Sequence, residues 1–275
     1  MTDGGAQSHT RMRSLLEKHD LTPRKSLGQH FLADPNITRK IVYTAEVGPG
    51  SRVIEIGMGT GTLTAALAQT GATVVGYEVD ERLRPLLEEV LAPFPAVELR
   101  FADASRVDLA SALEGDRWVL VANLPYNVGT SIVLDALRHA PAIERIVVMV
   151  QAEVAQRLVA TVGTPAYGLP SVVVGLHATA RLAFRVPPQV FVPAPRVESA
   201  VVSIDRRPAP PLAEHAIRLA AAGFGQRRKM LRRSLAEVVD RPESVLTRAR
   251  IAPTARAEEL APGDWLRIAE VVEGD

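Results

Sequence analysis

The sequence contains no cysteine. Disulfide bonds, thiol catalysis and cysteine-ligated metal sites are therefore excluded, and a reducing cytoplasm is the expected compartment. No window approaches about 18 uncharged apolar residues, so we expect no membrane-spanning helix. The N-terminal stretch "MTDGGAQSHTRMRSLLEKHD" lacks the apolar core that a signal peptide carries.

The chain also has little net charge, because 32 basic residues nearly balance 31 acidic ones and leave a formal charge of +1. An anionic partner would have to be bound by local clusters of positive charge. The six histidines do not show the spacing of a metal site, and we expect no bound metal. A length of 275 residues, 47% of them hydrophobic, suits one large or two modest globular domains.

Short apolar segments of strand type alternate with helical patterns in the first half of the chain. This alternation predicts an α/β fold with a mostly parallel sheet and helices on both faces. Residues 165–205, rich in proline and β-forming residues, predict a closing antiparallel strand pair. The expected strands are 52–56, 73–77, 97–101, 118–122 and 143–150, and the expected helices between them include 36–45, 63–69 and 81–91.

Composition divides the chain into three parts. Residues 1–20 are polar and predict a flexible segment. The run "RRPAPP" at 206–211 predicts a linker, so we assign the sheet-containing domain to 21–208. The remainder, 209–275, is helical in pattern and rich in arginine, which predicts a small α-helical domain.

Glycines or carboxylates follow the first three expected strands. "VIEIGMGTGTLT" places Gly57, Gly59 and Gly61 before a helix, where glycine allows a sharp turn and a close approach to a ligand. Glu78 ends the second strand, where a carboxylate can accept hydrogen bonds from both hydroxyls of a ribose. Asp103 follows the third strand and could accept a hydrogen bond from an adenine amino group. Because parallel sheets bind ligands at the carboxyl ends of their strands, this order indicates a nucleoside.

Two alternatives remain open for these residues. Either carboxylate could cap a helix instead of binding a ligand. A dinucleotide-binding fold, and hence a nicotinamide oxidoreductase, would also need glycines here. However, its fingerprint is G-x-G-x-x-G, and Thr62 stands where the last of those glycines should be.

The fourth strand ends in "ANLPYN" at 122–127. The side-chain oxygen of Asn123 and the backbone carbonyl of Leu124 can accept hydrogen bonds from an exocyclic amine. Pro125 fixes its own φ angle and stiffens the loop, and Tyr126 can stack on a base. A flipped base needs a second aromatic surface, for which Phe191 is the candidate, unless it only packs in the core. Taken alone, the tetrapeptide could equally be a strand-ending turn.

In combination, these motifs resemble the S-adenosylmethionine-dependent methyltransferases that modify exocyclic amines of nucleobases. The chain is most similar to the ribosomal RNA adenine dimethyltransferases of the KsgA/RsmA family. Met58 stands where that family usually has proline, and Ala102 where glycine is common. The matching segments are "KSLGQHFL", "EIGMGTG", "YEVD", "DA", "ANLPYN", "FVPAPRVESAVV", "GFGQRRKMLRRSL" and "PTARAEEL".

The resemblance implies a Rossmann-like S-adenosylmethionine-dependent methyltransferase sheet with a small C-terminal α-helical domain. It implies N6,N6-dimethylation of two adjacent adenosines in a 3′-terminal loop of small-subunit (16S) ribosomal RNA. The enzyme would be cytoplasmic and monomeric and would act on an assembling small subunit. The implied cofactor-binding residues are Gln29, His30, Leu32, Gly57, Gly59, Gly61, Glu78, Asp103, Ala104 and Asn123. His30 is not expected to act as a general base, and "QHFL" could alternatively be a helix entry with Leu32 in the core.

Basic residues form two local clusters that could contact RNA phosphates. If the second cluster is helical, residues 228 and 232 share a face, as do 229 and 233. A run of charge can also be only a solvated surface, but here the resemblance favours RNA contact. The candidates are Arg24, Lys25, Arg227, Arg228, Lys229, Arg232 and Arg233.

Two further functions remain as alternatives. One is the large-subunit ribosomal RNA adenine methylase of the macrolide-resistance type, which shares the fold, the cofactor and the Asn-Leu-Pro-Tyr loop. The other is a non-catalytic ribosome-assembly factor on the same scaffold. "GFGQRRKMLRRSL" and "PTARAEEL" favour the small-subunit family over the first alternative.

Overall fold

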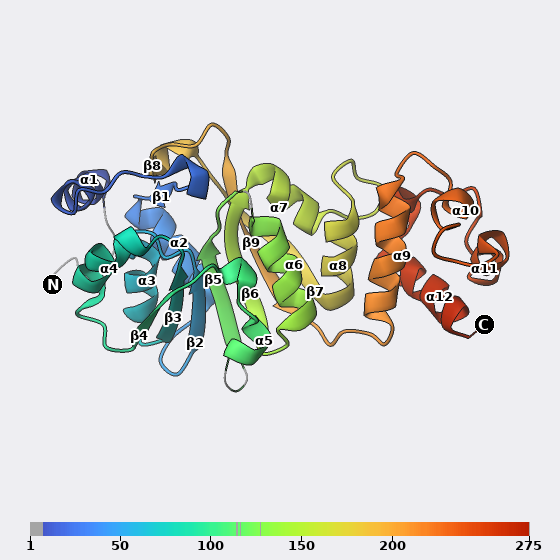
Figure 1. Ribbon diagram of the computed structural model, residues 1–275, viewed down its shortest axis with the longest axis horizontal. Coiled ribbons are helices and arrows are strands. Elements are labelled where there is room, and N and C mark those ends of the chain that lie inside the picture. The colour runs from blue at the N-terminus through green and yellow to red at the C-terminus, as the bar shows by residue number, and fades with distance from the viewer. Residues whose placement is uncertain (1–7, 114, 116, 127, 275) are drawn as a thin grey trace. The chain divides into compact units, whose positions relative to one another are not determined.

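The computed structural model describes residues 8–113, 115, 117–126 and 128–274. Its larger sheet contains strands in the order β4-β3-β2-β5-β6-β9-β7 (Figure 1). Strands β4, β3, β2, β5 and β6 pair in parallel, and β9 runs antiparallel to β6. The strands are β2 (Arg52–Ile56), β3 (Thr73–Glu78), β4 (Val97–Phe101), β5 (Trp118–Asn123), β6 (Ile143–Gln151), β7 (Ala178–Val186) and β9 (Ser199–Arg206).

The predicted α/β class is therefore confirmed, and the connections locate the site. From β2 the chain adds β3 and then β4 on one side, and it returns to place β5 and then β6 on the other. The strand order thus reverses between β2 and β5. Ligands bind at such a switch point, beyond the carboxyl ends of the strands.

Helices cover both faces of this sheet, as the nearly continuous burial of residues along β2, β3, β5 and β6 requires. Helices α2 and α3 pack with Val53, Val121 and Val147 in one apolar cluster. Successive side chains of a strand point to opposite faces, and Val150 lies beside Gly129 at the start of α6. Helix α6 therefore lies on the other face. The helices of this part are α2 (Pro35–Ala45), α3 (Thr62–Ala68), α4 (Arg84–Leu91), α5 (Leu109–Ala112), α6 (Gly129–His139) and α7 (Ala152–Val159), and the short 3₁₀ turns are η1 (Lys25–Leu27), η2 (Glu81–Leu83), η3 (Ala104–Arg106) and η4 (Pro188–Val190).

The predicted flexible segment 1–20 differs from the structure in its second half. Residues His9–Lys18 form helix α1, capped by the Ser8 hydroxyl. Met12 and Leu16, one helical turn apart, are buried and join an apolar cluster with residues of α4. These few apolar positions were hidden in a polar composition, because only their spacing marks them as one face. Residues 1–7 of the prediction lie outside the described residues.

A second, two-stranded sheet lies near the N-terminal segment. Strand β1 (Phe31–Leu32) pairs antiparallel with β8 (Phe191–Val192), so Leu32 lies opposite Phe191. This pairing brings residues 24–32, which we call the N-terminal strap, to the carboxyl edge of the larger sheet, where Phe31 packs against Gly59.

The described residues form two compact units. The first comprises the described part of Met1–Ala155 with Arg181–Asp205, and the second comprises Gln156–Ala180 with the described part of Arg206–Asp275. The second unit is mainly helical, as predicted for 209–275. Its further helices are α8 (Leu169–His177), α9 (Ala213–Gly225), α10 (Leu231–Ser234), α11 (Pro242–Arg248) and α12 (Pro262–Glu273), with the 3₁₀ turn η5 (Ala257–Glu259).

Residues Gln156–Ala180 were predicted to belong to the sheet domain, and the structure places them in the second unit. The reason is that α8 is apolar around most of its circumference and packs with α9 and α12. The Tyr167 hydroxyl donates a hydrogen bond to the carbonyl of Leu260 at 2.8 Å. A linker-like composition therefore marked only one of the points where the chain passes between the units.

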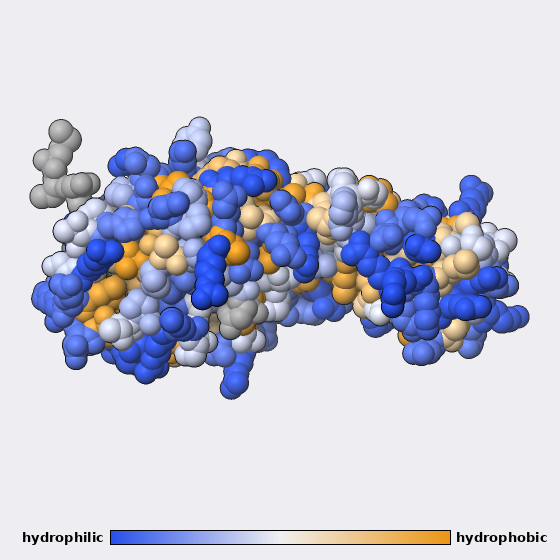
Figure 2. All heavy atoms as spheres, turned by 90° about the horizontal axis from the view of Figure 1, so that it is seen from above, coloured by the Kyte–Doolittle hydropathy of each residue, from blue (hydrophilic) through white to orange (hydrophobic). Residues whose placement is uncertain are grey.

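Large apolar side chains are exposed at scattered positions of the described chain, among them Tyr43, Val162 and Val238. Figure 2 shows mostly hydrophilic residues on the face in view. None of the described helices has the length and apolar character needed to span a membrane.

Candidate functional site

A pocket opens at the carboxyl ends of β2, β3 and β5, beside the strap. It is the place that the strand order predicts for a ligand. Of the sequence-predicted site residues, the structure brings ten to this pocket: Gln29, His30, Leu32, Gly57, Gly59, Glu78, Asn123, Leu124, Pro125 and Tyr126.

The glycine loop after β2 has backbone geometry that other residues adopt rarely. Gly59 has φ 55°, and a Cβ atom there would lie 2.9 Å from the Phe31 ring. The strap can therefore pack closely on the loop only because residue 59 is glycine. Gly61, with φ 74°, begins α3 and faces Leu87 and Val90 rather than the pocket. Its position is explained by packing, which corrects the prediction that it lines the ligand site.

Glu78 ends β3 with its side chain buried, and three backbone N–H groups hold its carboxylate. Gly59 donates to Oε2 at 2.8 Å, while Val79 and Asp80 donate to Oε1 at 2.9 and 3.0 Å. Burial raises the pKa of this carboxyl, and the three donors lower it in part. A carboxylate has roughly four lone-pair positions, so acceptor capacity remains for a ligand hydroxyl. Glu78 therefore does not cap a helix but is oriented at the pocket wall.

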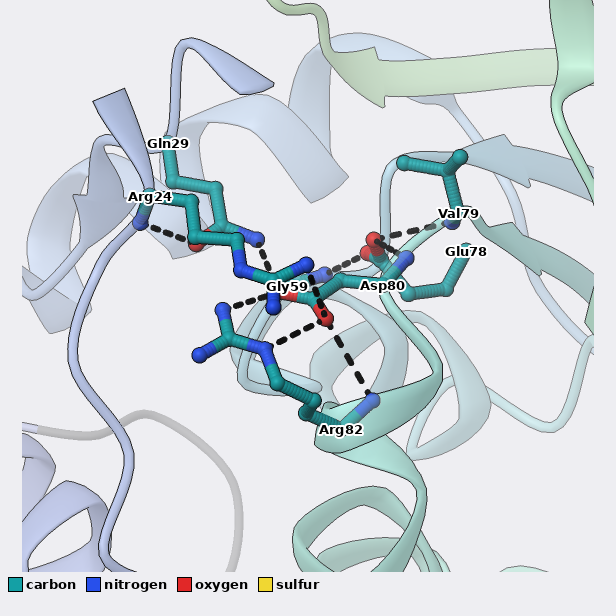
Figure 3. Close-up of polar contacts among 7 residues, drawn as sticks. All are labelled: Arg24, Gln29, Gly59, Glu78, Val79, Asp80 and Arg82. Carbon is teal, nitrogen blue, oxygen red and sulfur yellow. Dashed lines mark hydrogen bonds and ion pairs between the residues drawn. The ribbon is translucent and has the colours of Figure 1, made fainter. Parts of the chain in front are cut away.

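The strap is attached next to Glu78 through Asp80. The Gln29 amide donates to Asp80 Oδ2 at 3.0 Å, and the Gln29 oxygen accepts from the backbone N–H of Arg24 at 2.8 Å. Arg82 binds the same carboxylate with Nε at 2.9 Å and with a terminal nitrogen at 2.6 Å. Figure 3 shows these side chains converging on Asp80. The hydrogen bond from Arg82 chiefly holds the pKa of Asp80 below its ordinary value, so the attachment point stays ionised.

Glu55 is a pocket residue that the sequence analysis missed. It lies inside β2 with 1% of its surface exposed, and its Oε2 has no hydrogen-bond partner. The pKa of this carboxyl is raised to about 8, chiefly by burial and in smaller part by the nearby Glu78 carboxylate, against a hydrogen bond with Thr64 that lowers it. An acid within the apolar run "RVIEI" was the available signal, because an isolated buried carboxyl is costly unless a partner arrives.

The loop after β5 forms another wall of the pocket. Asn123 donates from Nδ2 to the backbone carbonyl of His30 at 3.1 Å, so the strap and this loop are directly joined. Leu124 is buried, and its backbone N–H donates to the carbonyl of Met149 at 3.1 Å. The Tyr126 hydroxyl is hydrogen-bonded to Ser199 at 2.8 Å, and its ring stacks on the His30 ring with centroids 5.4 Å apart.

Besides Gly61, three more residues predicted to contact the cofactor or the target base do not line the pocket. Phe191, the first residue of β8, has 2% of its surface exposed and packs in the apolar core, so the prediction of a second stacking surface is not met there. The aromatic ring that does lie beside Tyr126 is His30. Asp103 and Ala104 lie at η3, where Asp103 accepts hydrogen bonds from the backbone and hydroxyl of Ser105 at 3.0 and 2.6 Å. Asp103 thus caps η3, and its predicted contact with adenine stays a prediction.

The predicted basic cluster of the second unit is not one continuous helix. Helix α9 ends at Gly225, and α10 begins only at Leu231, because two glycines weaken the end of α9 and Gln226 forms a turn. Arg227, Arg228 and Lys229 therefore lie in the connecting turn, and the predicted shared helical faces are wrong. Arg232 and Arg233 belong to α10.

The cations of this cluster differ in their partners. Arg227 pairs with Glu258 at 2.8 Å, and Arg232 pairs with Glu243 at 3.0 Å. Arg228, Lys229 and Arg233 are exposed and make no ion pair with any residue that the structure describes. In the first unit, the Arg24 guanidinium lies 3.8 Å from Asp80, and Lys25 is exposed.

Among the described residues, no three histidine or acidic side chains are grouped so that they could hold a metal ion. The pocket instead combines two buried carboxylates, a glycine loop and an amide beside an aromatic ring. Such a set of groups can bind a ligand with hydroxyls and positive charge, and can present a hydrogen-bond acceptor next to it.

Comparison with known proteins matches residues 21–273 to the family model described as "Ribosomal RNA adenine dimethylase". The "Ribosomal RNA small subunit methyltransferase A" of Phenylobacterium zucineum is 45% identical over 262 residues, which cover 94% of this chain and 91% of the relative. The protein of the same name from Chelativorans sp. is 44% identical over 271 residues, covering 95% of this chain and 97% of that one.

Two solved structures share the fold over most of the chain. A dimethyladenosine transferase from Plasmodium falciparum superposes with a TM-score of 0.75 at 23% identity, covering 87% of this chain and 96% of that one. The 23S rRNA methyltransferase ErmE superposes with a TM-score of 0.67 at 29% identity, covering 88% and 99%.

Proposed function

The chain belongs to the ribosomal RNA adenine dimethylase family, and from this premise we propose that it dimethylates the N6 amino groups of two adjacent adenosines in a 3′-terminal loop of small-subunit (16S) ribosomal RNA. The observation that carries the proposal is the junction of the glycine loop, Glu78 and the Asn123–Tyr126 loop around one pocket. When bound, S-adenosylmethionine supplies the methyl group, which is carried on a positively charged sulfur.

The pocket residues fit this cofactor. Glu78, oriented by three backbone donors, accepts hydrogen bonds from the ribose hydroxyls. The unpartnered Oε2 of Glu55 gives the cofactor a hydrogen-bonding atom inside the pocket. Gly57 and Gly59 let the backbone approach without side-chain obstruction. Asp103, with Ala104, remains a candidate for the adenine end, since its side chain is 43% exposed and its Oδ2 pairs only with the exposed Arg106, at 3.4 Å, while Ser105 donates to Oδ1.

The loop after β5 receives the target amine. The nitrogen of an adenine amino group is a weak nucleophile because its lone pair is delocalised into the ring. Acceptors aimed at its two N–H groups, the Asn123 oxygen and the Leu124 carbonyl, stabilise the positive charge that develops as the nitrogen attacks. Pro125 stiffens the loop, and stacking on Tyr126 contributes roughly 1–3 kcal/mol to holding the base.

Two alternatives are weaker. The large-subunit methylase ErmE shares the fold at 29% identity, but small-subunit methyltransferases are 44–45% identical over 94–95% of this chain, which includes the second unit. A non-catalytic assembly factor would not need an acceptor loop joined to a complete pocket wall.

The proposal also covers RNA binding, for which the second unit supplies basic residues. Arg228, Lys229 and Arg233 are exposed cations suited to the phosphates of ribosomal RNA, with Arg227, Arg232, Arg24 and Lys25 as further candidates. We place the reaction on an assembling small subunit in the cytoplasm, carried out by a monomer.

A direct test uses purified protein, labelled S-adenosylmethionine, and small and large subunits from cells that lack the enzyme. We expect label in small subunits only, and fragment mass mapping should find two adjacent dimethylated adenosines near the 3′ end of the RNA. Label in large-subunit RNA would favour the ErmE-type function. Binding to small subunits without any transfer would favour the non-catalytic factor.

A further inference from the structure

His30 lies where the strap meets the acceptor loop, and it makes three contacts there. Its backbone carbonyl accepts from Asn123 Nδ2 at 3.1 Å. Its ring stacks on Tyr126 with an angle of 25° between the planes. Its Nδ1 lies 2.7 Å from the carbonyl oxygen of Pro193. The residue was predicted only as a cofactor contact, yet two of its three partners belong to the acceptor loop.

The first contact decides the orientation of the Asn123 side chain. A backbone carbonyl can only accept a hydrogen bond, so the amide must present its nitrogen to His30. The amide oxygen is then turned away from His30. That oxygen is the atom that must accept a hydrogen bond from the target amine, so the His30 backbone keeps the amide in its useful orientation.

The second and third contacts restrain Tyr126. Because the Pro193 carbonyl is an acceptor, Nδ1 of His30 carries the hydrogen and donates it, which sets the plane of the imidazole. The imidazole covers one face of the Tyr126 ring. The Tyr126 hydroxyl is held at 2.8 Å by Ser199, which is fully buried at the start of β9. A base that stacks on Tyr126 would have to use the opposite face of the ring.

The position of His30 is itself determined from the end of β3. The preceding residue, Gln29, is bonded to Asp80, and Asp80 is held by Arg82 (Figure 3). The following residue, Phe31, packs on Gly59 and pairs with Val192. His30 is thus fixed on both sides by groups that do not belong to the acceptor loop.

We propose that His30 is a positioning residue of the methyl-acceptor site, which orients the Asn123 amide through its backbone and the Tyr126 ring through its imidazole. The inference rests on the proposed methyl transfer and assigns the strap a role in the chemical step as well as in cofactor binding. The side-chain part of this role acts through Tyr126.

Two substitutions of His30, each made in two backgrounds, test this proposal. His30→Leu fills a similar volume without a ring, and His30→Phe keeps a ring against Tyr126. Each is made in the wild type and in Tyr126→Ala. Single-turnover transfer is measured at saturating S-adenosylmethionine and small subunits, and the cofactor Kd is measured by calorimetry.

We expect His30→Leu to slow transfer roughly 10-fold, because a misplaced acceptor loses alignment, with the cofactor Kd changed less than about twofold. His30→Phe should retain most of the rate. In the Tyr126→Ala background, His30→Leu should add little, because residues that act as one unit are not additive.

Three outcomes would overturn the inference: a wild-type rate in His30→Leu, equal losses in both backgrounds, or a raised Kd with an unchanged saturated rate. If His30→Leu does not fold, His30→Phe becomes the deciding variant. A folded His30→Phe with a wild-type cofactor Kd and a slow transfer rate would then overturn the role of the His30 ring. Failure of the proposed function looks different, since the wild type itself would then transfer no methyl group to adenosine.

Discussion

At the scale of single residues, the pocket contains polar groups whose hydrogen-bonding capacity the protein itself does not fully use. Glu55 is buried with one oxygen unpaired, and the oxygen of Asn123 is turned away from the strap that holds its nitrogen. Buried or oriented polar groups of this kind are costly for folding and are useful when a ligand completes them. For each of these two residues, we expect a conservative substitution to have a measurable effect on methyl transfer or on stability.

Asn123→Ala should slow methyl transfer roughly 10²–10³-fold, the effect of removing one polar group aimed at developing charge. Binding to small subunits should be largely kept, because the phosphate contacts lie elsewhere. The measurement is single-turnover transfer together with subunit binding. Asn36→Ala, an exposed position on α2, is the matched control. Near-normal turnover of Asn123→Ala would contradict the acceptor role.

Glu55→Gln should change how stability depends on pH. The pKa of this carboxyl is 4.5 when exposed and about 8 in the folded protein. Between these values the unfolded chain loses the proton and the folded chain keeps it, so the free energy of unfolding falls as pH rises to about 8 and then levels. The variant removes this slope.

Calorimetry without cofactor should therefore find that the Tm of Glu55→Gln, relative to the wild type, increases between about pH 5 and about pH 8. Gln69→Glu, at an exposed helix end, is the control. A Tm difference that is constant over this range would mean that Glu55 titrates normally.

At the scale of elements, the strap is the segment whose attachment matters most. It has little regular structure of its own, apart from η1 and two residues of β1. It is held by β8, by the packing of Phe31 on Gly59, and by the hydrogen bond from Gln29 to Asp80. A short segment held by few contacts responds strongly to the removal of any one of them.

Gln29→Ala should weaken S-adenosylmethionine binding roughly 10-fold, since it removes a hydrogen bond to a charged group that holds the strap over the pocket. Amide hydrogen exchange within residues 24–32 should become faster. Gln69→Ala, which alters an amide outside the pocket, is the control for calorimetry. An unchanged Kd with unchanged exchange would show that β8 alone holds the strap.

At the scale of the whole molecule, charge is distributed so that recognition of RNA must be local. The chain carries a net charge of only +1, yet exposed cations that make no ion pair within the described residues gather at Arg228, Lys229 and Arg233. Salt dependence is the observable that separates phosphate binding from a merely solvated surface, because each phosphate that a cation neutralises releases counterions.

The triple variant Arg228→Ala, Lys229→Ala, Arg233→Ala should weaken subunit binding and flatten the plot of log Kd against log salt. The slope should fall by about 0.7–0.9 for each phosphate that the variant no longer neutralises. The control removes the same charge at Arg39, Arg84 and Arg117, which are exposed in the first unit. Equal slopes in the wild type and the first variant would make the cluster a solvated surface.

The order of the elements followed from the sequence because the signals are local. Short apolar segments and the helical patterns between them located β2 to β6 to within a residue or two. Since parallel strands end at one edge, the glycine loop, Glu78 and Asn123 could be expected to meet there. Composition was less informative: it missed the apolar face of α1 and the membership of α8 in the second unit.

What only the tertiary structure decided depends on residues that are far apart in the chain. His30 and Asn123 are 93 positions apart, and no local pattern indicates that a backbone carbonyl of one orients the amide of the other. Phe191 and His30 are both aromatic and lie near the site in sequence motifs, but the pairing of β1 with β8 buries the first and leaves the second against Tyr126. The sequence by itself determined which polar residues lie at the carboxyl edge of the sheet, because the pattern that marks each parallel strand and its end is local. Tertiary packing decided which of their side chains line the pocket.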